Sequence, residues 1–299
     1  MKLTTTEWGN LLLLEKEFKR RGENLSRENL MKLLHVPLNR ARTYQFALEN
    51  RDVIAFNPMN VEVYEDRTEL ILSDLHIPFH DEIAIEAALN YADGFRITDI
   101  TLLGDFIDFY KISRFTKDPT ERSVSEELAI GKAFLTMLTK RFPNAKIRYK
   151  MGNHEARLAV YIMSQAKEIY DLVDNLLETR LGLKELGIEL ITEPFRVGKL
   201  WHLHGHEKTG GSYNPEYATN VIWNYVFDHF IAGHFHRGQE KIYKRIDDHI
   251  FYGGIVGYLA KELDYAMLNK WTKGFAIVNY ASDGMFRVRL HNIFNGQVM

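Results

Sequence analysis

The 299-residue chain has no cysteine, only seven prolines, no long hydrophobic run and a net charge of only −2. Without cysteine it cannot form a disulfide, a thiolate zinc site or a cysteine nucleophile. The run LLLL at 11–14 is far shorter than the roughly 18 apolar residues that cross a bilayer. The first residues also lack the apolar segment of a signal peptide. We therefore expect a cytoplasmic protein with no membrane partner and no thiol chemistry.

The composition is that of an ordinary folded protein. Hydrophobic residues make up 45% of the chain and charged residues 26%, as in globular domains generally. The length fits one large domain of about 230 residues with a small one beside it. The charge is unevenly distributed, because residues 1–60 carry ten Lys or Arg against seven acidic residues, a balance of +3 that leaves −5 for the rest. The basic surplus therefore lies at the front of the chain.

Five short polar segments each follow a short apolar run that reads as a buried strand. Such runs lead into loops, and loops at the carboxyl ends of strands are where ligands collect in open sheets. Glycine precedes Asp105, Asn153, His206 and His234, where it permits sharp turns. The five segments are SDLH at 73–76, GDFID at 104–108, GNHE at 152–155, HGH at 204–206 and GHFH at 233–236.

The side chains in these segments favour a catalytic metal site. Imidazoles mixed with carboxylates and one amide suit manganese, iron or zinc better than a structural zinc or a calcium cage. A lone histidine is more often structural than a ligand. A structural role does not, however, explain why histidines recur in several of these polar segments. We predict two divalent metal ions, with manganese favoured and iron or zinc as alternatives. His202 and His204 share one side of a strand and are either supporting groups of the site or ordinary strand histidines.

The ordered set D-x-H, G-D-x-x-D, G-N-H-E/D, G-H and G-H-x-H, across residues 74–236, resembles the calcineurin-like metallophosphoesterase superfamily. The resemblance implies an α/β fold, a four-layer α/β/β/α sandwich, with two metal sites that share one carboxylate. It assigns one metal to Asp74, His76, Asp105 and His236, and the other to Asp105, Asn153, His206 and His234. It also implies that His154 lies beside the scissile ester, with Asp108 or Glu155 orienting His154 or a water molecule.

The resemblance also implies the reaction. Two neighbouring divalent ions activate a water molecule and neutralise phosphate oxygens, so no covalent enzyme intermediate is needed. Members that act on phosphoproteins commonly continue the second segment as G-D-x-x-D-R-G, with an arginine that grips phosphate. Here Phe109 stands in place of that arginine, which weakens the protein phosphatase interpretation. Arg157, on the next helix, and Lys208, in a glycine-rich loop, are candidates for binding the substrate phosphate, although both have ordinary structural roles as alternatives.

The front segment predicts helices rather than alternating strands and helices. Apolar residues from Trp8 to Phe18 recur at helical spacing, and Gly22 ends the pattern. Ser26 is a good helix N-cap, and Pro37 suits the first turn of a further helix. A short helix, a tight break and a second helix resemble a helix-turn-helix motif. The candidate nucleic-acid contacts are then Asn39, Arg40, Arg42, Thr43 and Gln45. A basic three-helix cap or lid is an equally good interpretation.

The remaining chain alternates between strands and helices. We predict a boundary between Phe56 and Arg67, with a helical domain at 1–60 and a metallophosphoesterase domain at 67–299. Helices are expected at 81–92 and about 123–141, strands at 98–103 and 145–150, and a helical insertion at 155–181. Four antiparallel strands are expected after His236.

These features favour a phosphodiesterase or nuclease that acts on DNA, RNA or nucleotides. A nucleic-acid-binding domain beside a hydrolytic site would hold a polymer near the metals. The first alternative is a phosphomonoesterase, including a Ser/Thr protein phosphatase. The second is a DNA-binding regulator that uses the large domain for assembly. Aromatic residues Tyr258, Tyr265 and Trp271 are either base-stacking groups or core residues.

Overall fold

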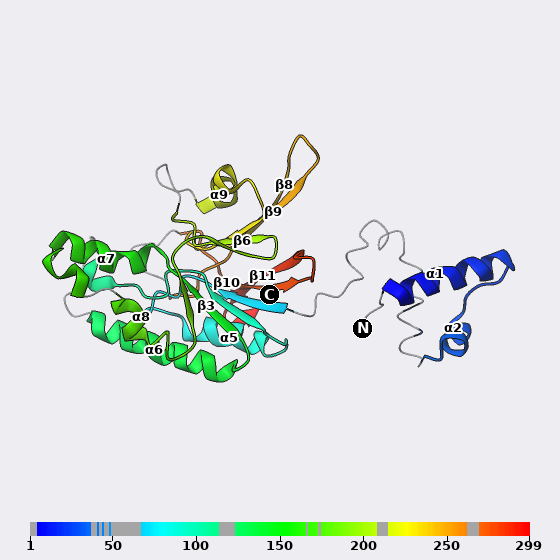
Figure 1. Ribbon diagram of the computed structural model, residues 1–299, viewed down its shortest axis with the longest axis horizontal. Coiled ribbons are helices and arrows are strands. Elements are labelled where there is room, and N and C mark those ends of the chain that lie inside the picture. Colours follow the sequence, from blue (N-terminus) through cyan, green and yellow to red (C-terminus); the bar gives the residue numbers. More distant parts are fainter. Residues whose placement is uncertain are drawn as a thin grey trace. The chain divides into compact units, whose positions relative to one another are not determined.

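The computed structural model describes residues 5–36, 41, 44, 48, 67–113, 123–165, 167–172, 175–207, 215–261 and 269–299. The chain divides into two compact units, Met1–Tyr64 and Glu65–Met299. Figure 1 shows the elements of each unit along the chain. In the described part, no helix combines the length and the apolar character needed to cross a membrane.

The first unit is helical. Helix α1 spans Thr5–Arg20 and α2 spans Arg27–Leu34, and the Ser26 hydroxyl caps α2 by accepting a hydrogen bond from the amide of Asn29. His35 ends α2 in the left-handed region, with φ of 49°, so a histidine occupies the turn where a glycine is usual. The core of this unit contains Leu11, Leu30, Ala41, Tyr44 and Leu48.

The predicted nucleic-acid contacts cannot be placed from these helices. Asn39, Arg40, Arg42, Thr43 and Gln45 all lie outside the described residues.

A seven-stranded sheet forms the centre of the second unit. Its strands lie in the order β12-β11-β10-β1-β2-β3-β4. Strands β1 to β4 are parallel, whereas β10 to β12 add antiparallel strands along the β1 side. The bounds are β1 Arg67–Leu72, β2 Asp99–Leu102, β3 Lys146–Lys150, β4 Glu189–Ile191, β10 Lys273–Tyr280, β11 Phe286–Phe294 and β12 Gln297–Val298.

A five-stranded sheet has the order β5-β6-β7-β9-β8. The expected antiparallel pairing after His236 occurs between β8 and β9 and between β10 and β11, but β9 is also parallel to β7. This difference arises because the β8–β9 hairpin inserts its second strand beside β7, and the second strand of a hairpin runs opposite to the first. The bounds are β5 Phe195–Val197, β6 Leu200–Leu203, β7 Phe230–Ala232, β8 Gln239–Lys244 and β9 Ile250–Ile255.

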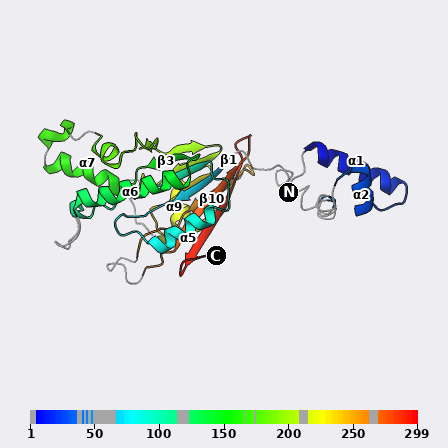
Figure 2. The ribbon, with the colours of Figure 1, turned by 90° about the horizontal axis from the view of Figure 1, so that it is seen from below.

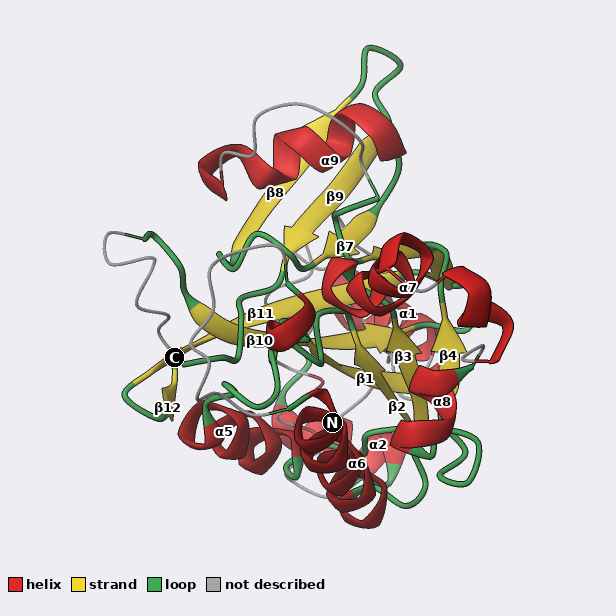
Figure 3. Ribbon diagram, turned by 90° about the vertical axis from the view of Figure 1, so that its left-hand side faces the viewer, coloured by secondary structure: helices red, strands yellow, loops and turns green. Residues whose placement is uncertain are grey.

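Helices cover the outer faces of both sheets, as Figure 3 shows. One apolar cluster joins the seven-stranded sheet to α5, α6 and α8, a second lies between the sheets, and a third lies under α9. The predicted α/β/β/α sandwich is therefore confirmed. The helices are α5 Glu82–Ala92, α6 Val124–Arg141, α7 Asn153–Gln165, α8 Leu176–Leu181 and α9 Ala218–Val226, with short 3₁₀ turns at Tyr110–Ile112, Lys167–Leu172 and Pro215–Tyr217.

A buried polar cluster lies between the sheets. The Glu69 carboxylate accepts hydrogen bonds from Thr101 at 2.5 Å and from Tyr280 at 2.5 Å, and lies 3.0 Å from Nε2 of His202. Burial alone would raise the pKa of Glu69, but the charge and hydrogen bond of His202 lower it to about 2. His202 is thus a structural histidine that connects β6 to β1.

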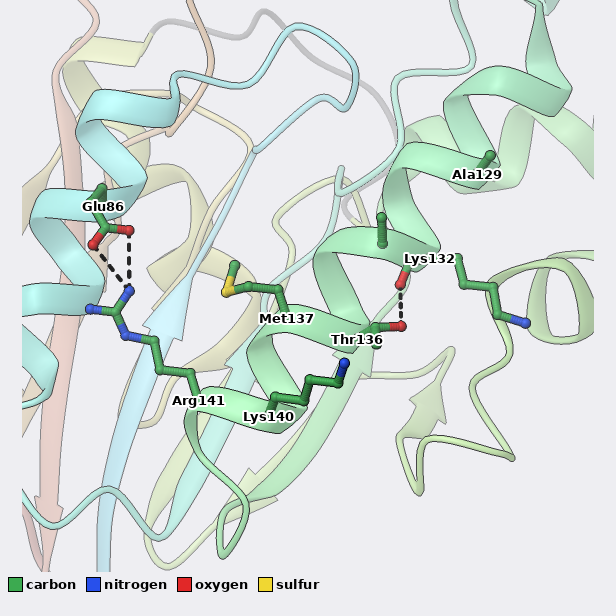
Figure 4. A pocket seen from close by; sticks show the side chains of 8 residues that line it. Glu86, Ala129, Lys132, Thr136, Met137, Lys140 and Arg141 are labelled. Atoms are coloured by element: carbon green, nitrogen blue, oxygen red, sulfur yellow. Dashed lines mark hydrogen bonds and ion pairs between the residues drawn. The ribbon is translucent and has the colours of Figure 1, made fainter.

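Helices α5 and α6 lie along the same face of the large sheet (Figure 2). An open groove of about 900 Å³ follows α6. Arg141, the last residue of α6, crosses to α5 and contacts Glu86 (Figure 4). It also contacts Asp93 at the end of α5. Because β3 begins just after α6 ends, this contact lies near the amino-terminal ends of the parallel strands, away from the loops that follow those strands.

Candidate metal centre

The five polar segments come together at one edge of the sandwich. Segments 73–76, 104–108 and 152–155 follow β1, β2 and β3, and segments 204–206 and 233–236 follow β6 and β7. Parallel neighbours bring their carboxyl ends to the same edge. The two sheets also meet there, since the amide of His234 donates to the carboxylate of Asp74 at 2.9 Å.

The first cluster consists of Asp74, His76 and His236. Nε2 of His236 lies 3.1 Å from both Oδ1 of Asp74 and Nε2 of His76, and the latter two atoms are 3.9 Å apart. Ligands bound at about 2.1 Å to one ion lie roughly 3 to 3.5 Å from each other. The two spacings of 3.1 Å fall in this range and the spacing of 3.9 Å lies slightly above it, so a small shift of one side chain would let all three atoms bind a single divalent ion.

The second cluster consists of Asp105, His204 and His234. Oδ2 of Asp105 lies 3.1 Å from Nε2 of His204, and Oδ1 of Asp74 lies 4.0 Å from that same nitrogen. The second distance links the two clusters. Asn153 begins α7 beside them, and its amide oxygen is buried.

The structure differs from the expected ligand set at the HGH segment. His204, and not His206, belongs to the cluster with Asp105 and His234. The ring of His206 lies 5.3 Å from that of His204 and 6.4 Å from that of His234. His204 follows β6 directly and its Nδ1 lies 2.7 Å from the carbonyl of Leu103 on the other sheet. Strand alternation, which puts His202 and His204 on one side facing the first sheet, was the signal that could have identified it.

Several buried polar atoms at this edge have no hydrogen-bond partner among the described residues. They are Oδ1 of Asp74, Oδ1 of Asn153, Nε2 of His204 and Nδ1 of His206. Oδ1 of Asp74 and Nε2 of His204 make ion-pair contacts instead, each at 3.1 Å, with His236 and with Asp105. Buried polar atoms are costly when unsatisfied, and lone pairs that converge on a common point are what a cation requires. The residues present therefore fit a divalent metal site.

The backbone at the cluster is strained in a consistent way. Five non-glycine residues have left-handed φ values, between 48° and 68°, namely Asp74, His76, Asp105, His234 and His236. Each such residue costs about 1 kcal/mol or more, and such strain gathers at functional sites. The strain turns each side chain from its strand toward the common edge.

Glycines of two kinds make room for these turns. Gly104 has φ of 95°, and a Cβ there would meet the His204 ring at 2.3 Å. Gly233 has no left-handed backbone, but a Cβ there would meet the Ser73 hydroxyl at 2.0 Å. Gly104, before Asp105, is thus needed both for the left-handed turn and for the close approach of the His204 ring. Gly233, before His234, is needed only for the close approach of Ser73.

Charges within the cluster shift its pKa values. Burial would raise the pKa of Asp105 and of Asp74, but the neighbouring histidines lower both. Burial would lower the pKa of His204, yet the carboxylate of Asp105 raises it to about 10. Burial, together with the charge on His204, lowers the pKa of His234 to about 3 and that of His206 to about 4. The cluster thus favours a positive charge at its centre.

His154 lies beside the first cluster. Its ring is 4.5 Å from that of His76, and its Nδ1 lies 2.9 Å from the carbonyl oxygen and 3.0 Å from Oδ1 of Asp108. Asp108 also contacts Nδ1 of His76 at 2.9 Å. Burial would raise the pKa of Asp108, but these two histidines lower it. Asp108 thus holds both rings.

Arg157 covers the other nitrogen of His154. Its Nη2 lies 2.7 Å from Nε2 of His154, and its Nη1 donates to the carbonyl of Asp108 at 2.9 Å. Arg157 therefore points into the site. Lys208 lies outside the described residues.

Glu155 has a different position from the one expected for a group that orients His154. Its buried carboxylate accepts hydrogen bonds from the Tyr149 hydroxyl and from the amides of Gly152, Asp105, Phe106 and Ile107, at 2.7 to 3.2 Å. Glu155 thus joins the loops after β2 and β3. Phe109, which stands in place of the phosphoprotein-binding arginine, is fully buried in the core.

Two of the aromatic residues pack on the first cluster. Tyr258 stacks on His236 with ring centres 5.3 Å apart, and Trp271 meets the same ring edge-on at 4.5 Å. Tyr258 is buried, whereas Trp271 is partly exposed. Tyr265 lies outside the described residues.

Comparison with known sequences finds that the chain is similar to two phage proteins. The chain is 24% identical over 230 residues to the Gene 54 protein of Mycobacterium phage L5, which covers 70% of this chain and 87% of that protein. It is 23% identical over 177 residues to the Gene 54 protein of Mycobacterium phage D29, which covers 56% and 68%. No family model matches the sequence.

Similar solved structures include a Vps29 single mutant from Entamoeba histolytica. It is 12% identical in sequence, the alignment covers 78% of this chain and 96% of that chain, and the TM-score is 0.40. The Pseudomonas putida nuclease MPE aligns at 16% identity over 74% and 86%, with a TM-score of 0.31. The phosphoesterase Yfce from E. coli aligns at 12% identity over 74% and 98%, with a TM-score of 0.32.

Proposed function

Because the large unit has the calcineurin-like metallophosphoesterase fold, we propose that this protein hydrolyses phosphate esters with two divalent metal ions. The observation that carries the proposal is the convergence of partnerless buried atoms from Asp74, Asn153 and His204 on two neighbouring His/Asp clusters. A purely structural role for the edge would leave their desolvation uncompensated.

The proposed ligands follow the clusters. Asp74, His76 and His236 hold one ion, and Asn153, His204 and His234 hold the other, with Asp105 shared between them. His204 thus replaces His206 in the ligand set. Imidazole, carboxylate and amide donors support manganese, with iron or zinc as alternatives. Such a pair of ions lowers the pKa of a water and neutralises phosphate oxygens.

The remaining groups act on the leaving side of the ester. Once Arg157 has left Nε2 and that nitrogen has taken up a proton from solvent, His154 delivers the proton from Nε2 to the departing oxygen and returns to its neutral form. Asp108 fixes the ring through Nδ1. Arg157 lies 2.7 Å from that Nε2 and is well placed to bind a phosphate oxygen. When Arg157 moves to the phosphate, Nε2 of His154 is freed from this contact. Arg157 thus takes the place of the arginine that Phe109 replaces.

We further propose that the substrate is a phosphodiester in nucleic acid or in a nucleotide. The helical front unit and its balance of +3 over residues 1–60 support this substrate, as does the partly exposed Trp271 beside His236. A phosphomonoester is the second candidate, because Arg157 offers a bidentate contact that suits a terminal phosphate.

The decisive experiment uses purified protein loaded with Mn²⁺. Hydrolysis of bis-aryl and mono-aryl phosphate esters and of linear and single-stranded DNA is measured for wild type and for Asp105→Asn. The metal content of each protein is measured in parallel. Asp283→Asn, in the exposed turn between β10 and β11, is the matched control for an aspartate-to-asparagine change.

The expected result is loss of bound metal and of hydrolysis in Asp105→Asn, with both unchanged in Asp283→Asn. Equal activity of wild type and Asp105→Asn would refute the two-metal mechanism. Cleavage of the monoester alone would refute the nucleic-acid substrate and leave the phosphomonoesterase.

A further inference from the structure

Strand β8 forms an edge of the five-stranded sheet. The amide of Arg245 bonds to the carbonyl of His249 on the β9 side. Backbone groups alternate in direction along a strand, so the amides and carbonyls of Glu240, Ile242 and Lys244 point away from β9. Within the part of the chain that the structure describes, no strand pairs with that side of β8.

The side chains of these three residues share one exposed face. Ile242 is 62% exposed, and Ile250, opposite Lys244 on β9, is 59% exposed. The other face is covered, because Tyr243 is buried and stacks on Trp223 of α9 with ring centres 4.4 Å apart. The hairpin therefore combines an open backbone edge with a face on which exposed isoleucines lie beside charged side chains. Exposed edges of this kind pair with other strands unless something blocks them.

We propose that β8 pairs antiparallel with β8 of a second copy of this chain, about a two-fold axis at Ile242. In this register Ile242 faces its own counterpart, and Glu240 faces Lys244 of the second copy. Two charge pairs result, since a two-fold interface repeats every contact. All outward amides and carbonyls of the three residues find partners at once.

The pairing of Glu240 with Lys244 distinguishes this register from the two registers whose axes lie one residue away. An axis at Lys241 would place Glu240 opposite Ile242, and an axis at Tyr243 would place Ile242 opposite Lys244. Only the axis at Ile242 joins opposite charges across the pair, which is the favourable cross-strand arrangement. A lysine on an edge strand commonly discourages pairing, but here the pairing itself supplies its counter-charge. The present contacts of these two residues are weak, because Lys244 pairs with the exposed Asp248 and Glu240 accepts a long hydrogen bond, 3.5 Å, from the Tyr252 hydroxyl.

The first test exploits the absence of cysteine. Ile242→Cys introduces a single thiol, and paired antiparallel residues lie about 5.5 Å apart, which a disulfide can bridge. Mild oxidation should give a covalent dimer on a non-reducing gel. Ile83→Cys, on a 70% exposed residue of α5, is the control for random collision and should stay monomeric.

The second test exchanges charges. Glu240→Lys and Lys244→Glu should each weaken the dimer about tenfold or more, measured by sedimentation velocity over a series of concentrations. An equimolar mixture of the two variants should dimerise again, because every pair in the mixed dimer is then oppositely charged. The double variant Glu240→Lys/Lys244→Glu should behave as wild type.

These readouts do not depend on hydrolysis, so they stand or fall separately from the proposed function. Monomeric wild type at all concentrations, or a disulfide no faster in Ile242→Cys than in Ile83→Cys, would overturn the proposal. A dimer that survives both single charge changes would overturn the register.

Discussion

His204 and His206 are separated by one glycine, yet their surroundings differ. His204 is buried between the sheets against Asp105, whereas His206 is partly exposed and outside the clusters. We predict that His204→Gln loses one of two bound Mn²⁺ ions and slows hydrolysis about 100-fold or more. His206→Gln should keep both ions. Metal analysis and steady-state kinetics on the same preparations check this, and equal losses in the two variants would contradict the assignment.

Glu127 is a second residue whose environment sets its behaviour. It is fully buried on α6, and its Oε2 has no hydrogen-bond partner in the part of the chain that the structure describes. Burial, with a smaller contribution from Asp108, raises the pKa of Glu127 from 4.5 to about 7. The folded protein therefore holds this proton more tightly than the unfolded chain does, and stability is lost as the pH rises from about 4.5 to about 7.

We predict that Glu127→Gln, which keeps the neutral form, raises the free energy of unfolding by roughly 2 kcal/mol at pH 8. The difference should shrink toward zero as the pH falls below the unfolded pKa of the carboxyl group. Urea unfolding of metal-free protein in chelator, at acidic and alkaline pH, measures it. A difference that is the same at both pH values would show that the carboxyl does not titrate as described.

At the scale of the elements, one buried ion pair joins the ends of β3 and β6. The Lys150 ammonium lies 3.0 Å from Oε1 of Glu207 and donates to the carbonyls of Met151 and Thr192, each at 2.8 Å. The Glu207 carboxylate accepts from the amides of His204 and Gly205. Burial would raise the pKa of Glu207, but Lys150 lowers it to about 2. The pair thus holds the loops that carry Asn153 and His204.

We predict that Lys150→Met lowers the free energy of unfolding by about 3 kcal/mol, because it leaves a buried carboxylate without its counter-charge. The double variant Lys150→Met/Glu207→Gln should be more stable than the single one. Both should bind one of the two Mn²⁺ ions at least about tenfold more weakly. Denaturant titration and calorimetric Mn²⁺ binding measure the two effects. Unchanged binding of both ions would limit the pair to a role in stability.

Most elements of the large unit could be predicted because local signals mark their ends. The helices expected at 81–92 and 123–141 are Glu82–Ala92 and Val124–Arg141, which begin after the capping residues Asp81 and Ser123. The helical insertion expected at 155–181 consists, within the described residues, of α7, a 3₁₀ turn and α8. Its apolar residues show helical spacing throughout, but spacing carries no information on where packing interrupts a helix.

At the scale of the whole molecule, the division at Tyr64 and Glu65 separates the basic front from the acidic remainder. We predict that deletion of residues 1–64 leaves hydrolysis of a small aryl ester unchanged. Binding of DNA should weaken, with a smaller dependence on salt, because fewer cations contact phosphates. Ester kinetics and DNA titrations at several salt concentrations check both parts. Unchanged DNA binding would assign the front unit to a role other than substrate binding.

The sequence by itself determined the chemistry of the site. Its five segments contain side chains of the types that suit divalent ions, and each follows a strand, so their meeting at one edge could be predicted from strand direction alone. The absence of cysteine excluded thiolate donors.

Only the tertiary structure decided which side chains meet. The choice of His204 over His206 depends on the packing of β6 against the loop after β2, where the ring of His204 contacts the Leu103 carbonyl. The position of Glu155 depends on four amides from two different loops and on the Tyr149 hydroxyl of β3. Whether residues far apart in the chain make a contact depends on differences in distance of a few tenths of an ångström. A motif gives the order of residues along the chain and contains no information about those differences.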